Sequence, residues 1–103
     1  MGNKLGLADS RKGGKLTLGL SGRLDTESAP ELQSFLDGAL ADVTELRLDM
    51  KGLAYVSSAG LRVLLAAHKR MDQAGGTMVV EHANQTVREV FAVTSFDKIL
   101  TLN

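Results

Sequence analysis

The stretch from residue 44 to residue 73 limits the possible folds of this chain more than any other. Its first part, 44–50, alternates apolar and polar residues, which is typical of a strand with one buried face. Residues 58–73 then repeat apolar positions at helical spacing and end before a pair of glycines. We therefore predict a strand, a short turn that contains Gly52, and a long helix.

The predicted long helix has two different faces. At about 100° per residue, the residues expected to face the core are Leu61, Leu64, Ala67, His68 and Met71. The residues expected on the outer face are Ser58, Arg62, Leu65, Lys69 and Gln73. Leu65 stands among polar residues there, so it is either an anchor for a protein partner or an exposed leucine of the ordinary kind.

The remaining segments alternate between strand and helix patterns. The predicted elements are, in order, strands over 4–8 and 15–20 joined by a glycine-containing connection, a break over 21–26, a helix over 29–40, a strand over 77–81, a helix over 85–93 capped by Asn84, and a strand over 99–102. The order β-β-α-β-α-β-α-β predicts an α/β fold in which three or more helices pack on a mixed sheet of about five strands. The length of 103 residues suits one domain over 1–103.

Charge and composition exclude several classes of function. Twelve basic residues balance twelve acidic ones without a basic block, which argues against charge-driven binding to nucleic acid or membranes. The chain has no cysteine, so disulfides, thiolate metal sites and a cysteine nucleophile are excluded. We see neither a signal peptide nor an apolar run as long as a membrane span. We expect a soluble, cytoplasmic protein without a cofactor or metal, whose partner is a protein or a small molecule.

Two serines stand where the strand pattern ends and the long helix begins. We expect Ser57 or Ser58 to cap this helix, with the side-chain oxygen accepting a hydrogen bond from a free backbone N–H. A catalytic serine would also need a base, and the two histidines are His68 and His82. No G-x-S-x-G motif is present, and His68 is ten residues farther along the same helix, about 15 Å away. We therefore do not expect an enzyme.

The segment DMKGLAYVSSAGLRVLL, residues 49–65, resembles the signature of STAS domains, and specifically of bacterial anti-sigma factor antagonists, or anti-anti-sigma factors. Alignment on Gly60 and the leucine after it places Ser58 on the serine that a partner kinase phosphorylates in this family. The resemblance continues through residues 22–25 and 93–100. The departures from the family pattern are Ser57 where Asp is frequent, Ser95 where Gly is common, and an end at Asn103 where many relatives add a helix.

This resemblance implies a partner-switching function for a protein that is a monomer when free. The unphosphorylated form would bind an anti-sigma factor that is itself a serine kinase of the histidine-kinase-like ATPase fold, so that a sigma factor or other target is released. Phosphorylation of Ser58, with Ser57 as the second candidate, would end the complex, and a serine phosphatase would reset it. The residues expected to bind the partner are Asp25, Ser57, Ser58, Arg62, Leu65 and Lys69. Asp25 either lies near Ser58 or caps the first helix at a distance from it.

A second interpretation keeps the fold but changes the task. STAS-like domains also serve as ligand-sensing or scaffold subunits, among them parts of lipid-transport systems and tails of anion transporters. The helix N-terminus at Ser58 would then hold a nucleotide phosphate or another anion, without a phosphorylation switch. The glycine pairs 13–14 and 75–76 lack the Lys-Ser/Thr of a P-loop and do not support a phosphate loop.

Overall fold

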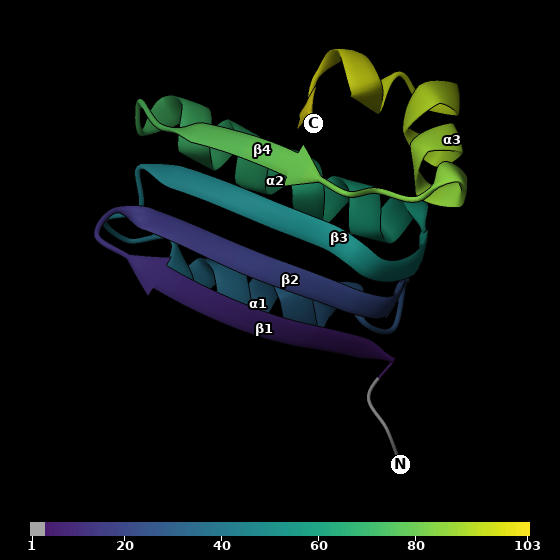
Figure 1. Cartoon of the computed structure of the whole chain (residues 1–103), viewed down its shortest axis with the longest axis horizontal. Helices are drawn as coiled ribbons and strands as arrows, with labels where there is room; N and C mark the ends of the chain where they lie inside the picture. Colours follow the sequence, from purple (N-terminus) through teal and green to yellow (C-terminus); the bar gives the residue numbers. More distant parts are fainter. Residues whose placement is uncertain (1–3) are drawn as a thin grey trace.

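Within the part of the chain that the structure describes, five strands form one sheet (Figure 1). The computed structural model describes residues 4–103. Its elements are, in chain order, β1 (Leu5–Lys12), β2 (Lys15–Leu24), α1 (Ala29–Ala39), β3 (Glu45–Val56), α2 (Ser58–Gln73), β4 (Thr77–Glu81), α3 (Gln85–Val93), a 3₁₀ helix (Phe96–Lys98) and β5 (Thr101–Leu102). The strands lie in the order β1-β2-β3-β4-β5, with β1 and β2 antiparallel and the other neighbours parallel. The predicted mixed sheet and element order are confirmed.

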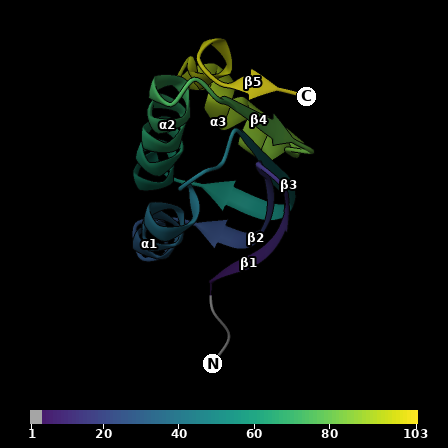
Figure 2. The same cartoon turned by 90° about the vertical axis from the view of Figure 1, so that its left-hand side faces the viewer.

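Helices α1 and α2 lie on one face of the sheet, and α3 lies beyond the end of β4 (Figure 1, Figure 2). Alternating residues of β2 and β3 form the buried face of these two strands. They are Leu16, Leu18, Leu20 and Leu24 in β2, and Leu46, Leu48, Met50, Leu53 and Val56 in β3. Four of the five residues predicted for the core face of α2 are buried: Leu61, Leu64, Ala67 and Met71. Gly60 and Val63, which were not predicted for this face, are buried as well. His68 is only half-buried.

Strand β2 is longer than predicted. We expected the strand pattern to break over residues 21–26, but β2 continues to Leu24, which is fully buried. Two shifts in the register between β2 and β3 make this continuation possible, and Gly22 has a φ of 84°, which favours glycine. The backbone N–H of Arg23 donates to the Lys4 carbonyl oxygen at 2.7 Å, so the bent strand stays bonded to the chain beside it.

Strand β3 is also longer than predicted, because the expected turn that contains Gly52 does not form. The strand runs to Val56, and Leu53 and Val56 continue its buried face. A Cβ on Gly52 would lie 2.8 Å from the Cβ of Ser21 on β2. Glycine is required at this position because two strands approach closely there, not because the chain turns.

Smaller differences concern the ends of the elements. The residue ranges of α2, β4 and α3 agree with the predictions, and Asn84 is the predicted cap of α3. Strand β1 extends to Lys12, beyond the predicted 4–8, since every residue of it pairs with β2. Strand β5 is shorter than the predicted 99–102, because a 3₁₀ turn holds Ile99 through a bond from its N–H to the Phe96 carbonyl oxygen.

The ends of β2 and β3 position the candidate site. Leu24 is the register partner of Val56, and the N–H of Ser57 donates to the Leu24 carbonyl oxygen at 2.8 Å. The residues that follow the two strands, Asp25 and Ser57, therefore leave the sheet at the same edge. The first turn of α3 is tied to this edge as well, because the Asn84 side-chain amide donates to the Leu53 carbonyl oxygen at 3.0 Å.

Gly60 determines how closely the first turn of α2 packs on the sheet. A Cβ at this position would lie 2.6 Å from Leu24 Cγ and 3.0 Å from Val56 Cγ2. We expect Gly60→Ala to lower the free energy of unfolding by about 1–2 kcal/mol, because overpacking outweighs the gain in helix propensity.

The matched control is Gly38→Ala in α1. Gly38 is exposed, and a Cβ there would meet nothing within 4 Å, so this substitution should raise the free energy of unfolding by about 0.4–1 kcal/mol. Urea unfolding followed by circular dichroism measures both variants. A Gly60→Ala variant that is as stabilised as Gly38→Ala would contradict the close packing of α2.

Candidate functional site

The two serines at the start of α2 have different roles in the structure. Ser57 is the N-cap residue, with extended backbone angles (φ −96°, ψ 175°), and its Oγ accepts a hydrogen bond from the Gly60 N–H at 3.3 Å. Ser58 is the first residue of the helix and is exposed. Within residues 4–103, the Ser58 hydroxyl makes no hydrogen bond to another protein group. Ser57 is thus used by the fold, and Ser58 is available to a partner.

Asp25 lies at the same edge, directly after β2, and its carboxylate is held in place. Its Oδ1 accepts hydrogen bonds from the backbone N–H groups of Glu27 at 3.0 Å and Ser28 at 3.1 Å, in the turn that leads into α1. The buried Ser28 hydroxyl donates to the Arg23 carbonyl oxygen at 2.7 Å and braces the same turn. Asp25 therefore organises the turn before α1, as one of its two predicted alternatives has it, although the N-cap residue of that helix is Ser28. A role of Asp25 toward Ser58 stays a prediction.

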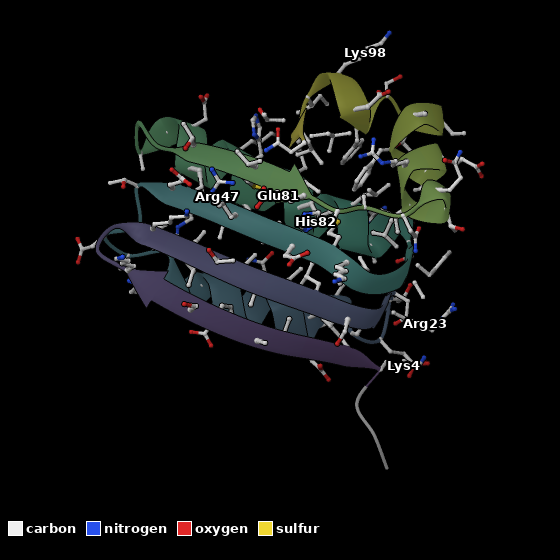
Figure 3. All side chains as sticks on the ribbon, viewed as in Figure 1. Lys4, Arg23, Arg47, Glu81, His82 and Lys98 are labelled. Atoms are coloured by element: carbon white, nitrogen blue, oxygen red, sulfur yellow. The ribbon has the colours of Figure 1, made fainter. Side chains whose placement is uncertain are left out.

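Two cations, Lys4 and Arg23, lie close to the Asp25 carboxylate; both are labelled at the lower right of Figure 3. Lys4 Nζ lies 3.3 Å from Asp25 Oδ2 and 3.1 Å from Glu27 Oε1, and Arg23 Nε lies 3.8 Å from the same Asp25 oxygen. The Arg23 guanidinium also stacks over the Tyr55 ring, 4.5 Å from its centroid. The charges of Lys4, Arg23, Asp25 and Glu27 thus compensate one another locally.

These contacts shift the pKa values of Asp25 and Lys4 away from each other. Burial alone would raise the pKa of Asp25, but hydrogen bonds from the Ser28 N–H and the Lys4 ammonium outweigh it, so the pKa lies below its ordinary value of 3.8. The hydrogen bonds that Lys4 donates to Glu27 and Asp25 raise the pKa of its ammonium above 10.5. Both groups are therefore charged at neutral pH.

The outer face of α2 continues from Ser58 away from this charged cluster. Arg62 and Lys69 are exposed, and Leu65 between them is half-buried. The structure thus brings Ser58, Arg62, Leu65 and Lys69 together on one helix face, and the β2 end brings Asp25 to the N-terminal end of that helix.

The sequence did not reveal Lys4, Arg23 and Tyr55 as neighbours of the site. Arg23 and Tyr55 are partners in the register of β2 and β3, and Lys4 is 21 residues from Asp25 in the chain. The only sequence signal was their basic and aromatic character next to predicted strand ends, which does not specify a pairing.

A second group of charged residues lies on the sheet face away from α1 and α2, apart from Ser58 (Figure 3). Arg47 contacts Glu45 at 2.5 Å and Glu81 at 3.0 Å, and His82 Nδ1 lies 2.9 Å from Asp49 Oδ1. Over the described part of the chain, no group of three or more His, Cys, Asp and Glu residues could hold a metal ion. No helix in the same residues is long and apolar enough to cross a membrane.

Comparisons with known proteins agree on one family. A family model described as "Mlab, STAS domain" matches residues 7–101. The "Putative anti-sigma factor antagonist BtrV" of Bordetella bronchiseptica is 39% identical over 85 residues, which cover 81% of this chain and 72% of that protein. The anti-sigma F factor antagonist of Paenibacillus polymyxa is 30% identical over 91 residues, which cover 86% of this chain and 78% of that protein.

Solved structures show the same fold. An anti-sigma factor antagonist from Mycobacterium paratuberculosis superimposes with a TM-score of 0.84 at 23% identity, over 95% of this chain and 84% of that one. The anti-sigma factor antagonist SpoIIAA in its unphosphorylated form gives a TM-score of 0.83 at 17% identity, over 95% of this chain and 88% of that one.

The different roles of the two serines can be tested by their effect on stability. We expect Ser57→Ala to lower the free energy of unfolding by about 0.5–1 kcal/mol, because the N-cap hydrogen bond is lost. Ser58→Ala should change it by less than about 0.5 kcal/mol, because the exposed hydroxyl makes no bond in the fold. Urea unfolding of both variants and the wild type measures this difference, and equal losses would contradict the assignment of Ser57 as the cap.

The lowered pKa of Asp25 predicts a pH-dependent contribution to stability. A carboxyl group whose pKa is lower in the folded state stabilises the fold above its unfolded pKa and loses this effect as the pH falls through the folded pKa. The free energy of unfolding of Asp25→Asn should therefore be below that of the wild type at pH 7, and the gap should close as the pH falls below 3.8. Urea unfolding at several pH values measures the gap; a gap that stays constant would contradict the charged role of Asp25.

Proposed function

The chain belongs to the STAS domain family of anti-sigma factor antagonists, and from this we propose that its unphosphorylated form binds an anti-sigma factor and that phosphorylation of Ser58 ends this binding. One observation carries the proposal: Ser58 is an exposed hydroxyl in the first turn of a helix, while the neighbouring Ser57 is occupied as the cap. A kinase can therefore modify Ser58 without breaking a bond on which the fold depends.

The proposed partner surface begins at Ser58 and follows the outer face of α2. Leu65 supplies a half-buried apolar side chain that a partner can cover fully, and Arg62 and Lys69 flank it with positive charge. Asp25 completes the surface at the end of β2. Such a surface suits a partner with an apolar centre and acidic groups around it.

A phosphate on Ser58 would act on the interface and leave the fold intact. It adds about 1.5 to 2 negative charges at a helix N-terminus, where free N–H groups and the helix dipole favour an anion. A partner packed around Ser58 would have to remove water from this dianion and place it near Asp25. A penalty of about 3 kcal/mol already weakens binding more than a hundredfold.

The remaining steps of the cycle follow from this switch. The anti-sigma factor would itself be a serine kinase of the histidine-kinase-like ATPase fold, which transfers the γ-phosphoryl group of ATP to Ser58 Oγ, while the hydroxyl loses its proton and ADP leaves. Binding of the unphosphorylated protein would free a sigma factor or another target. A serine phosphatase would restore the hydroxyl by hydrolysis. The protein itself, a cytoplasmic monomer when free, would act as substrate and binding partner and would catalyse no step.

The test is to compare wild type, Ser58→Ala and Ser58→Asp as baits in the cytoplasm of the source organism. We expect wild type and Ser58→Ala to capture an ATPase-fold anti-sigma factor, and Ser58→Asp to lose it. With the purified partner, the dissociation constant of the protein phosphorylated at Ser58 should be at least about 100-fold above that of the unmodified form. Mass spectrometry should locate the phosphate on Ser58.

Two results would reject the phosphorylation switch. If all three baits capture the same partner and Ser58 is never modified, the protein is a ligand-sensing or scaffold module of the same fold. If the phosphate is found on Ser57 instead, the cap would be the modified group, and the role assigned to Ser58 would be wrong.

A further inference from the structure

Arg62 follows Ser58 by one helical turn on the exposed side of α2. Residues four apart on a helix are surface neighbours, with Cβ atoms about 5–6 Å from each other. Both side chains are exposed, and α2 is continuous from Ser58 to Gln73. The long Arg62 side chain therefore reaches a phosphate on Ser58 Oγ without any change in the backbone.

In the unmodified protein, the Arg62 side chain has no acidic partner among the described residues, unlike Lys4 and Arg23 at the same edge. Lys4 lies 3.3 Å from Asp25 and 3.1 Å from Glu27, and Arg23 lies 3.8 Å from Asp25. Within residues 4–103, Arg62 forms no salt bridge and its side chain donates no hydrogen bond. A new phosphate at Ser58 would thus compete with existing carboxylates for Lys4 and Arg23, but not for Arg62.

We propose that Arg62 turns back onto phosphorylated Ser58 and pairs with its phosphate, so that Arg62 determines how phosphorylation changes the partner surface. The inference rests on the proposed function, because it requires phosphoserine at position 58. A planar guanidinium binds two phosphate oxygens at once, which a lysine at the same position cannot do. Arg62 is therefore a specificity-determining residue of the switch.

This pairing gives phosphorylation two effects with the same direction. Before modification, the Arg62 guanidinium is free to bind a carboxylate of the anti-sigma factor. After modification, the same guanidinium is occupied by the phosphate, and the surface around Leu65 has gained a dianion and lost a free cation. A partner with an acidic group opposite Arg62 then loses its own ion pair with that guanidinium, and the phosphate and Arg62 together leave a net negative charge that repels it.

The test uses protein with phosphoserine placed at position 58 during synthesis, and reads the second pKa of the phosphate by ³¹P NMR titration at low salt. An adjacent cation favours the dianion, so Arg62 should lower this pKa. We expect Arg62→Gln to raise it by about 0.2–0.4 unit from the wild-type value, as follows from the strength of an i,i+4 ion pair. The difference should shrink in about 1 M salt, where screening is strong.

Two further variants show whether position and geometry matter. Lys69→Gln removes a positive charge from the same helix face, eleven residues after Ser58, and should leave the phosphate pKa at its wild-type value. Arg62→Lys should restore the pKa only in part, because the charge returns without the two-pronged geometry. An Arg62→Gln variant with the wild-type pKa, or one that shifts no more than Lys69→Gln, would overturn the proposal.

A negative result of this titration can be distinguished from a failure of the proposed function. The phosphate is introduced chemically, so the titration does not depend on whether any kinase recognises the chain. If the capture experiment shows no switch, the proposed function is rejected, but the pairing of Arg62 with phosphorylated Ser58 is not. If Arg62→Gln leaves the phosphate pKa unshifted, the pairing is rejected, and the switch would operate through the charge on Ser58 alone.

Discussion

The parallel pairing of β2 with β3 is the interaction on which the other parts of this molecule depend. The two strands contribute the most deeply buried leucines of the sheet, and each leads into one of the helices that cover it. Because Leu24 and Val56 end the pair in register, Asp25 and Ser57 leave the sheet at one edge. The positions at which α1 and α2 begin, and hence the place of Ser58, follow from where this one ladder ends. The bond from the Ser57 N–H to the Leu24 carbonyl oxygen carries the pairing one residue beyond β3.

Much of the architecture could be predicted because hydrophobic periodicity is local. Alternation predicted the strands, the spacing of apolar residues predicted α2 and its buried face, and the segment from Asp49 to Leu65 indicated the STAS family, which the comparisons confirm. Two errors arose at segments that contain glycine, where we predicted a break over 21–26 and a turn at Gly52. Gly22 and Gly52 lie inside strands, at a bulge and at a close approach to Ser21, and both requirements come from a neighbouring strand distant in the sequence. No local pattern distinguishes these uses of glycine from a loop.

The candidate site could also be predicted only in part, because local patterns place the serines but do not show which residues lie near them in the fold. The serine pair stood out because it follows a strand pattern and precedes a helix, but either serine is a good N-cap by residue type alone. Only the backbone angles at Ser57 and its bond to Gly60 separate the two. The surroundings of Asp25 depend on Lys4, 21 residues away, and on the turn at Ser28, so they required the folded chain.

Two groups of side chains meet at this edge of the sheet. One group makes hydrogen bonds and salt bridges that stabilise the fold, and the other makes none in the described part of the chain. Ser57 caps α2, and Asp25 with Lys4 and Ser28 stabilises the turn before α1, so changes at these positions affect the stability of the fold. Within the described residues, the side chains of Ser58 and Arg62 make no hydrogen bond or salt bridge, and they share a helix face with Leu65. Since a typical domain is stable by only about 5–15 kcal/mol, a switch built on the first group would endanger the fold whenever it operated. The switch that we propose at Ser58 would act on binding while the cap, the turn and the core remain as they are.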